Sequence, residues 1–368
     1  MKPQIVKILA GVIGLSMICL SIIQLIDSYS GLVFITDEQS GTPVTVITPD
    51  SANPERPLIL AGHGFSGSRQ NLYGFALNFA RAGFGVVLWD FDGHGVNANP
   101  FPENLDWAEF DTNVANAIEM ANEQGYQTER IAIMGHSMGS GVALSYGVMN
   151  PDTRSTIAVS PVPRPVSTSL PQNLLLMAGQ FETPFIDNAN QILQQAGGEG
   201  GSHEDGTARM FVEIPFVEHV TILFSPVAHR TALAWLNSTF GFQSNAQPYT
   251  DTRVVWWGLG ILGTLLVAQS IALPQSKINL SSNSTPSGWR RLLSLAAGSI
   301  SATIILWLLG SLGVNFRSIL GLLVGGFLLI WFAVAGITSW LISGMKPVLP
   351  SSREILSGLL VFCLLWLG

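Results

Sequence analysis

Cysteine is nearly absent from this sequence of 368 residues, which contains only Cys19 and Cys363. Both cysteines fall in long apolar stretches, so the polar central part of the chain, residues 31–250, has none. A disulfide framework and a thiolate metal site are therefore excluded for that central part.

Lysine is also absent from residues 31–250, where eight arginines stand against 21 acidic residues. The net charge of this part is −13, whereas the remainder of the chain carries +6. Proteins that bind nucleic acid need a basic surface, which this composition does not provide. We therefore expect no nucleic-acid partner.

Charge is scarce in the first 30 residues, where Lys2 and Lys7 precede an apolar run of about 19 residues, Ile8–Ile26. That length suits a membrane anchor. The alternative is a cleaved signal peptide, because Ser28-Tyr29-Ser30 resembles a cleavage site with small residues. The run is longer than a usual signal core, so the anchor is the favoured interpretation, and both place the next residues outside the cytoplasm.

The region after Asp251 is likewise poor in charge and predicts a membrane domain of three to four helices over residues 251–368. The interiors of its apolar runs contain no acidic or basic residue, which argues against a proton relay and favours a role as an anchor. Gly321 and Gly325 have the spacing of a helix-packing motif. The runs are Val254–Ala272, Leu292–Leu312, Ile319–Leu341 and the shorter Ile355–Leu367.

The basic residues that flank the apolar runs predict the topology. Cytoplasmic loops are enriched in lysine and arginine. If the amino terminus is cytoplasmic, the segments on the cytoplasmic side of the membrane (the inner segments) hold seven basic residues. The segments on the other side hold only Arg253 and Arg317. We therefore expect an integral, multi-pass membrane protein whose domain at residues 31–250 is extracytoplasmic. The inner residues are Lys2, Lys7, Lys277, Arg290, Arg291, Lys346 and Arg353.

Between the membrane regions, strand patterns alternate with helix patterns, which predicts an α/β domain with a mostly parallel sheet covered on both faces. Chemistry in such sheets lies at the carboxyl ends of the strands. The predicted strands are Leu32–Thr36, Val44–Thr48, Pro57–Ala61, Val86–Asp90, Arg130–Met134, Ser155–Ser160, Leu174–Ala178 and Met210–Ile214, and the predicted helices are Asn71–Ala82, Trp107–Asn122, the segment after Ser137, Phe185–Gln195 and Pro226–Thr239.

The segment Gly135-His136-Ser137-Met138-Gly139 lies between a predicted strand and a predicted helix. A Gly-x-Ser-x-Gly turn in this setting is typical of a nucleophile elbow, in which Gly135 and Gly139 avoid collisions and the Ser137 hydroxyl projects from the sheet. An ordinary glycine-rich turn is the alternative. The strand before it and the helix after it favour the elbow.

Several motifs occur in the order expected of an α/β hydrolase: His63-Gly64, Asp90-Phe-Asp-Gly93-His94-Gly95, the elbow, Gly179-Gln-Phe-Glu182, and His219 followed by Pro226. With these motifs, residues 31–245 resemble the serine hydrolases of that superfamily, which include esterases, lipases and serine aminopeptidase-like proteins. The resemblance implies an α/β-hydrolase fold and acyl transfer to water. It does not extend to the membrane regions.

A serine hydroxyl needs a base within hydrogen-bond reach and a carboxylate to orient that base. The order Ser137, Glu182, His219 matches the order nucleophile, acid, histidine of this fold. Asp187 is the alternative acid, because aspartate is commoner at this position in the family. His229 is the alternative base, but it falls in a predicted helix on an apolar stripe, whereas His219 falls in a loop.

The developing oxyanion needs two N–H donors, which we expect from Met138 and from Phe65 in the glycine-flanked loop after the early strand. His63, His94 and His136 lack metal-ligand spacing and an accompanying acidic cluster, so no metal site is expected, and no organic cofactor is implied. Only Pro161–Asn173 separates two of the predicted strands, which predicts an open site without a lid domain.

Together these patterns predict a membrane-anchored serine hydrolase, organised as an anchor at residues 1–30, a hydrolase domain at 31–250 and a membrane domain at 251–368. The expected substrate is a small or lipid acyl ester, with a thioester or a peptide as alternatives. The rival hypothesis is a catalytically silent hydrolase-like domain that serves as the sensor or scaffold of a membrane complex.

Overall fold

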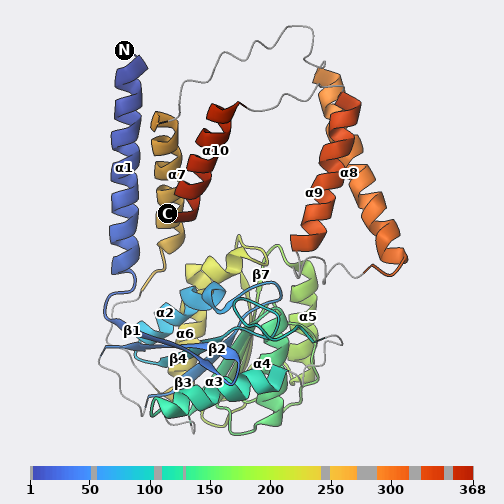
Figure 1. Ribbon diagram of the computed structural model, residues 1–368. Coiled ribbons are helices and arrows are strands. Elements are labelled where there is room, and N and C mark those ends of the chain that lie inside the picture. Colours follow the sequence, from blue (N-terminus) through green and yellow to red (C-terminus); the bar gives the residue numbers. More distant parts are fainter. Residues whose placement is uncertain are drawn as a thin grey trace. The chain divides into compact units, whose positions relative to one another are not determined.

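The computed structural model describes residues 3–50, 56–102, 110–126, 130–241, 249–271, 288–314, 325–343 and 351–367. The chain divides into two compact units. One comprises Gln24–Val255, and the other comprises Met1–Ile23 together with Trp256–Gly368. The first contains the sheet, and the second contains the apolar helices (Figure 1).

An eight-stranded sheet forms the frame of the first unit, in the order β1-β2-β4-β3-β5-β6-β7-β8. β2 runs antiparallel to β1 and β4, and the remaining neighbours are parallel. This mostly parallel sheet confirms the predicted fold class, the α/β-hydrolase fold. The strands are β1 (Leu32–Gln39), β2 (Thr42–Pro49), β3 (Leu58–Gly62), β4 (Gly85–Trp89), β5 (Ile131–His136), β6 (Ser155–Val159), β7 (Leu174–Gly179) and β8 (Arg209–Ile214).

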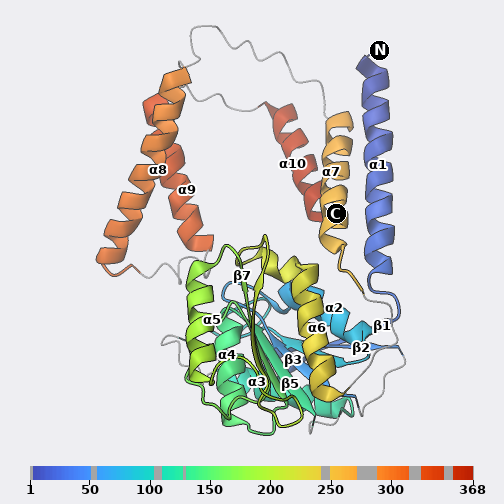
Figure 2. The ribbon, with the colours of Figure 1, turned by 180° about the vertical axis from the view of Figure 1, so that it is seen from behind.

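Helices cover both faces of the sheet (Figure 2). One face packs against α2 (Tyr73–Arg81) and α6 (Pro226–Phe240), and the other against α3 (Asp111–Glu123), α4 (Met138–Met149) and α5 (Thr183–Gln195). Successive residues of a strand point to opposite faces. Thus Ala132 and Met134 of β5 join the core beneath α2 and α6, whereas Ile131 and Ile133 join the core on the other face.

The predicted element boundaries differ from the observed ones in a few places. The segment predicted as one helix over Asn71–Ala82 is a short 3₁₀ turn, Arg69–Leu72, followed by α2. α3 begins at Asp111, and the predicted start at Trp107 lies outside the described residues. Segment 161–173 contains neither helix nor strand, so the connection between β6 and β7 is a loop, as expected.

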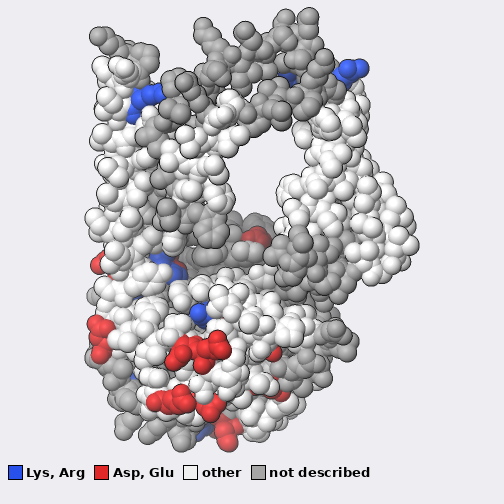
Figure 3. Space-filling view, in the orientation of Figure 1, with Lys and Arg blue, Asp and Glu red and all other residues white. Residues whose placement is uncertain are grey.

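Among the residues that the structure describes, four helices are long and apolar enough to cross a membrane: α1 (Pro3–Asp27), α7 (Arg253–Ile271), α8 (Gly288–Ser311) and α9 (Gly325–Ser343). On the face drawn in Figure 3, the acidic side chains gather over the sheet-containing unit, Gln24–Val255, which we call the hydrolase unit. The described surfaces of the apolar helices are almost entirely uncharged along their lengths. A shorter helix, α10 (Ser352–Leu367), ends the described chain. The predicted basic residues Lys2, Lys277, Arg317 and Lys346 lie outside the described residues.

Small and hydroxyl-bearing residues form the contact between α8 and α9. A Cβ added to Gly298 would collide with the backbone carbonyl of Ala335, 2.6 Å away, so the two helices approach closely there. The Ser301 hydroxyl donates to Thr338 Oγ1 at 3.1 Å, and the Ser339 hydroxyl donates to the carbonyl of Ser294 at 2.9 Å. Such contacts hold apolar helices together in lipid, where the hydrophobic effect hardly favours associated helices over separate ones. Of the predicted glycine pair, Gly321 lies outside the described residues.

Candidate active site

Ser137 stands at the sharp turn between β5 and α4, with φ 53° and ψ −117°. A residue other than glycine pays a conformational cost in this region, which neighbouring contacts must offset. The Ser137 N–H donates to the carbonyl of Val159 on the adjacent strand at 2.9 Å. Glycine is required on both sides, because a Cβ at Gly135 would overlap the carbonyl of Gly139, and one at Gly139 would overlap the carbonyl of Gly62. The turn therefore has the geometry of an elbow.

His219 lies between Ser137 and Glu182. Its Nδ1 is 2.6 Å from Glu182 Oε1, and its Nε2 is 3.0 Å from the Ser137 hydroxyl. A carboxylate only accepts hydrogen bonds, so the hydrogen of the neutral imidazole resides on Nδ1. Nε2 is then free to accept the hydrogen of the serine hydroxyl. The structure thus brings together the three side chains predicted as nucleophile, base and acid.

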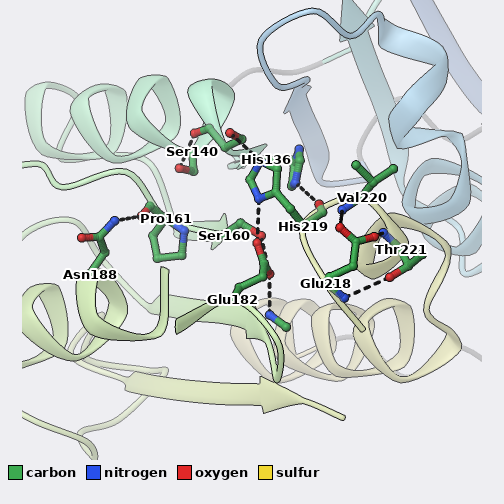
Figure 4. A network of polar contacts seen from close by, with 12 residues as sticks. His136, Ser140, Ser160, Pro161, Glu182, Asn188, Glu218, His219, Val220 and Thr221 are labelled. Carbon is green, nitrogen blue, oxygen red and sulfur yellow. Dashed lines mark hydrogen bonds and ion pairs between the residues drawn. The ribbon is translucent and has the colours of Figure 1, made fainter. Parts of the chain in front are cut away.

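Glu182 is held in place by two further donors (Figure 4). Its Oε2 accepts from the backbone N–H of Gly179 at 2.6 Å and from the Ser160 hydroxyl at 3.0 Å. The residue is only 4% exposed, so these hydrogen bonds replace the water that burial removes. The alternative acid, Asp187, is exposed on α5, and its carboxylate does not contact His219.

His136, the residue before Ser137, contacts the loop that carries His219. Its Nε2 donates to the backbone carbonyl of His219 at 2.8 Å, which requires the hydrogen on Nε2. Burial and, to a smaller extent, the nearby His219 together lower the pKa of His136 to about 3, so the ring is neutral at pH 7. On its other side, the His219 ring stacks on Phe185 with centroids 4.5 Å apart.

Met138 and Phe65, predicted as oxyanion donors, occupy the two expected positions. Met138 begins α4, where the first backbone N–H groups have no intrahelical acceptor. Phe65 follows β3 in a loop that approaches the elbow closely, because a Cβ at Gly64 would lie 3.2 Å from Ser137 Cβ. Both residues thus lie on segments beside Ser137. Their role as oxyanion donors stays a prediction.

A buried ion pair fixes the loop that carries Phe65. Asp90 accepts hydrogen bonds from the backbone N–H of Arg69 at 2.7 Å and of Val96 at 3.0 Å, and its carboxylate pairs with the Arg69 guanidinium. His63 in the same loop accepts from the N–H of Phe91 at 3.2 Å. Asp90 therefore ties the loop after β3 to the loop after β4. This role of Arg69 was not predictable from the sequence, because nothing in its spacing pairs it with Asp90.

His63, His94 and His229 have packing or turn roles in the structure. His63 is fully buried, and burial lowers its pKa to about 4. His94 donates to the carbonyl of Asp92 at 2.9 Å. His229 lies inside α6, is 1% exposed, and donates to the carbonyl of Leu223 at 2.8 Å. Within the described part of the chain, no group of three or more histidine, cysteine or acidic side chains could hold a metal ion.

The sheet order and the strand–serine–helix turn define an α/β hydrolase. The family model described as serine aminopeptidase, S33, matches residues 53–199. These residues run from just before β3 to just after α5, and they include the elbow and Glu182. The chain thus contains a domain with the α/β-hydrolase fold, and residues 53–199 of this domain are similar to that family.

Among characterised proteins, a monoacylglycerol lipase of Mycolicibacterium smegmatis is 30% identical over 115 residues. The match covers 31% of this chain and 40% of the lipase. Among solved structures, a CIB-like hydrolase of Thermoplasma acidophilum is similar with a TM-score of 0.44 and 21% identity, over 56% of this chain and 99% of that one. A membrane phospholipase A is similar with a TM-score of 0.44 and 14% identity, over 65% and 93%.

Proposed function

We propose that this protein is a membrane-anchored serine hydrolase that cleaves an acyl ester bond. The observation that carries the proposal is the position of His219, whose two ring nitrogens contact the Ser137 hydroxyl and the Glu182 carboxylate. The match to a serine hydrolase family supports the same reaction class. The resemblance to a lipase favours an ester over a peptide as substrate.

In the proposed reaction, the Ser137 oxygen attacks the substrate carbonyl while His219 Nε2 takes the hydroxyl proton. The Glu182 carboxylate stabilises the imidazolium that forms and holds it in orientation. The N–H groups of Met138 and Phe65 would receive the negative charge on the carbonyl oxygen. His219 then returns the proton to the leaving alcohol, which departs and leaves an acyl group on Ser137. Water hydrolyses this acyl-enzyme by the same steps in reverse order.

A fluorophosphonate probe tests whether the serine is activated, because it labels only nucleophilic serines. We expect the full chain in detergent to be labelled, and Ser137→Ala to abolish labelling. The rival function, a silent domain acting as sensor or scaffold, predicts an unreactive Ser137. Absence of labelling in a folded protein would therefore refute the proposed hydrolase.

The proposal includes an extracytoplasmic hydrolase domain, which follows from the distribution of basic residues around the apolar runs. Protease added to intact spheroplasts should then digest the domain. Full protection of the domain, with digestion only after the membrane is opened, would place it on the cytoplasmic side. That outcome would overturn the topology and leave the reaction class intact.

A further inference from the structure

The chain enters and leaves the hydrolase unit at neighbouring points. Asp27 is the last residue of the apolar helix α1, and Arg253 is the first residue of the apolar helix α7. Within the unit, the Arg253 guanidinium donates to the Tyr29 hydroxyl at 3.2 Å and forms an ion pair with Asp251. Since both helices would cross the bilayer, both points would lie at its surface.

A second arginine holds the same segments together. The Arg81 guanidinium donates to the carbonyls of Ser28 and Ser30 at 3.1 and 3.2 Å. It also lies over the ring of Tyr249, 4.6 Å from the centroid. The two ends of the unit are therefore fixed to its surface by Arg81 and Arg253.

The loop that carries His219 reaches this same part of the surface. The Arg253 guanidinium lies 5.8 Å from the ring centroid of Tyr73, the first residue of α2. The next residue, Gly74, packs closely against the carbonyl of Leu223, which would lie 2.9 Å from an added Cβ. Leu223 belongs to the 3₁₀ turn Thr221–Phe224, directly after His219.

Exposed apolar side chains are concentrated in this loop. Phe216 is 83% exposed, Val220 55% and Phe224 40%, although large apolar residues are usually buried. The one acidic residue between Phe216 and Phe224, Glu218, directs its carboxylate back to the loop, where it accepts from the N–H groups of Val220 and Thr221 at 3.1 and 2.9 Å. We call Phe216, Val220 and Phe224 the apolar edge.

We propose that the apolar edge contacts the lipid bilayer, so that an acyl ester reaches Ser137 directly from the membrane. The edge flanks the catalytic histidine, and it lies near the two points where the chain meets the bilayer. Aromatic and aliphatic side chains gain free energy when they enter the boundary between headgroups and acyl chains. This inference rests on the proposed function and narrows its substrate class to acyl esters that reside in the membrane.

Depth-dependent quenching tests the contact without relying on activity. Cys19 and Cys363 are replaced by serine in the full chain, and single variants Phe216→Cys, Phe224→Cys and Met149→Cys are labelled with an environment-sensitive fluorophore. Met149 is the matched control, because it is 57% exposed but lies at the end of α4 remote from Ser137. The protein is placed in phosphatidylcholine vesicles that contain a nitroxide lipid.

We expect the nitroxide lipid to quench the labels at positions 216 and 224 at least threefold more than the label at position 149. Equal quenching at all three positions would overturn the proposal, because the edge would then be in water or covered by other segments of the chain. The Phe216→Asn/Phe224→Ser double variant provides a second test, since Asn tolerates the φ of 58° at position 216.

In the double variant, kcat/KM for monooleoylglycerol in phosphatidylcholine vesicles should fall at least tenfold more than kcat/KM for p-nitrophenyl acetate. An equal fall for both substrates would contradict membrane delivery. Ser137→Ala distinguishes this failure from failure of the proposed function, because it should abolish hydrolysis of both substrates while the quenching pattern stays unchanged. Hydrolysis that persists in Ser137→Ala would refute the hydrolase mechanism alone.

Discussion

The His136 imidazole donates its Nε2 hydrogen to the backbone carbonyl of His219, 2.8 Å away. A side chain next to Ser137 thereby holds the segment that carries His219, the proposed base. Loss of one neutral hydrogen bond costs about 1–1.5 kcal/mol, which corresponds to about a tenfold loss of rate if the contact is needed to position His219.

We therefore expect His136→Phe, which keeps a ring but removes the donor, to lower kcat for p-nitrophenyl acetate about tenfold with little change in KM. His136→Gln is the control, because its amide nitrogen can reach the same carbonyl and should restore most of kcat. Equal kcat in the wild type and in His136→Phe would show that the hydrogen bond does not position the base.

Alanine substitution of the two candidate bases, one at a time, should lower activity in one variant and stability in the other. His219→Ala removes the group that accepts the serine proton, so kcat should fall at least about a thousandfold while the domain stays folded. His229→Ala removes a buried side chain and should mainly lower the melting temperature. Near-normal turnover in His219→Ala, with turnover abolished in folded His229→Ala, would reverse the assignment.

The two candidate acids can be separated by amide substitutions. Glu182→Gln keeps the size of the side chain but removes the charge that stabilises the imidazolium, so kcat should fall about a thousandfold or more. Asp187→Asn is the matched control, because Asp187 is exposed on the helix that follows Glu182. It should change kcat by less than about twofold. The reverse pattern would identify Asp187 as the acid.

Buried histidines should make the fold sensitive to acid. Burial lowers the pKa of His63 and His229 to about 4 and that of His136 to about 3, whereas an unfolded histidine titrates near 6.5. Between these values the unfolded state binds protons that the folded state does not, so the free energy of unfolding falls as the pH falls from about 6.5 to about 4. Heat denaturation of the detergent-solubilised chain, followed by tryptophan fluorescence, should show this decline.

His229→Gln isolates one contribution to that decline, because its amide can still donate to the carbonyl of Leu223. A histidine with this shift contributes about 1.4 kcal/mol of lost stability per pH unit, so the variant should lose about 2–3 kcal/mol less than the wild type between pH 6.5 and 4.5. Identical pH dependence in both proteins would show that His229 is not responsible.

The fold was largely predictable from local patterns. The eight strands were predicted to within a few residues, because apolar and β-branched runs such as Ile131–Ile133 favour buried parallel strands. The start of α6 at Pro226 followed from the capping residue Ser225, whose side chain accepts from the N–H of Ala228. The motif Gly135–Gly139 located the elbow, because its tight turn has a strict requirement for small residues.

The hydrogen bonds that hold the site residues in place were less predictable, because they join residues that are distant in the sequence. Ser160 holds Glu182 only because β6 and β7 are neighbours in the sheet. The contact of His136 with His219 depends on a loop 83 residues further along the chain. Spacing within one segment carries no signal for such contacts. Predicting them from the sequence would require the order of strands and the conformation of the loops.

The adjacency of Tyr29 and Arg253 also bears on how such a protein could arise. Domains whose two ends lie together can be inserted into another protein without separating the residues on either side of the insertion point. The hydrolase unit meets this condition, since the hydrogen bond between Arg253 and Tyr29 joins the segments at its two ends. The geometry therefore suits insertion of the unit into a loop of another protein, or its removal from one, without separating the residues on either side.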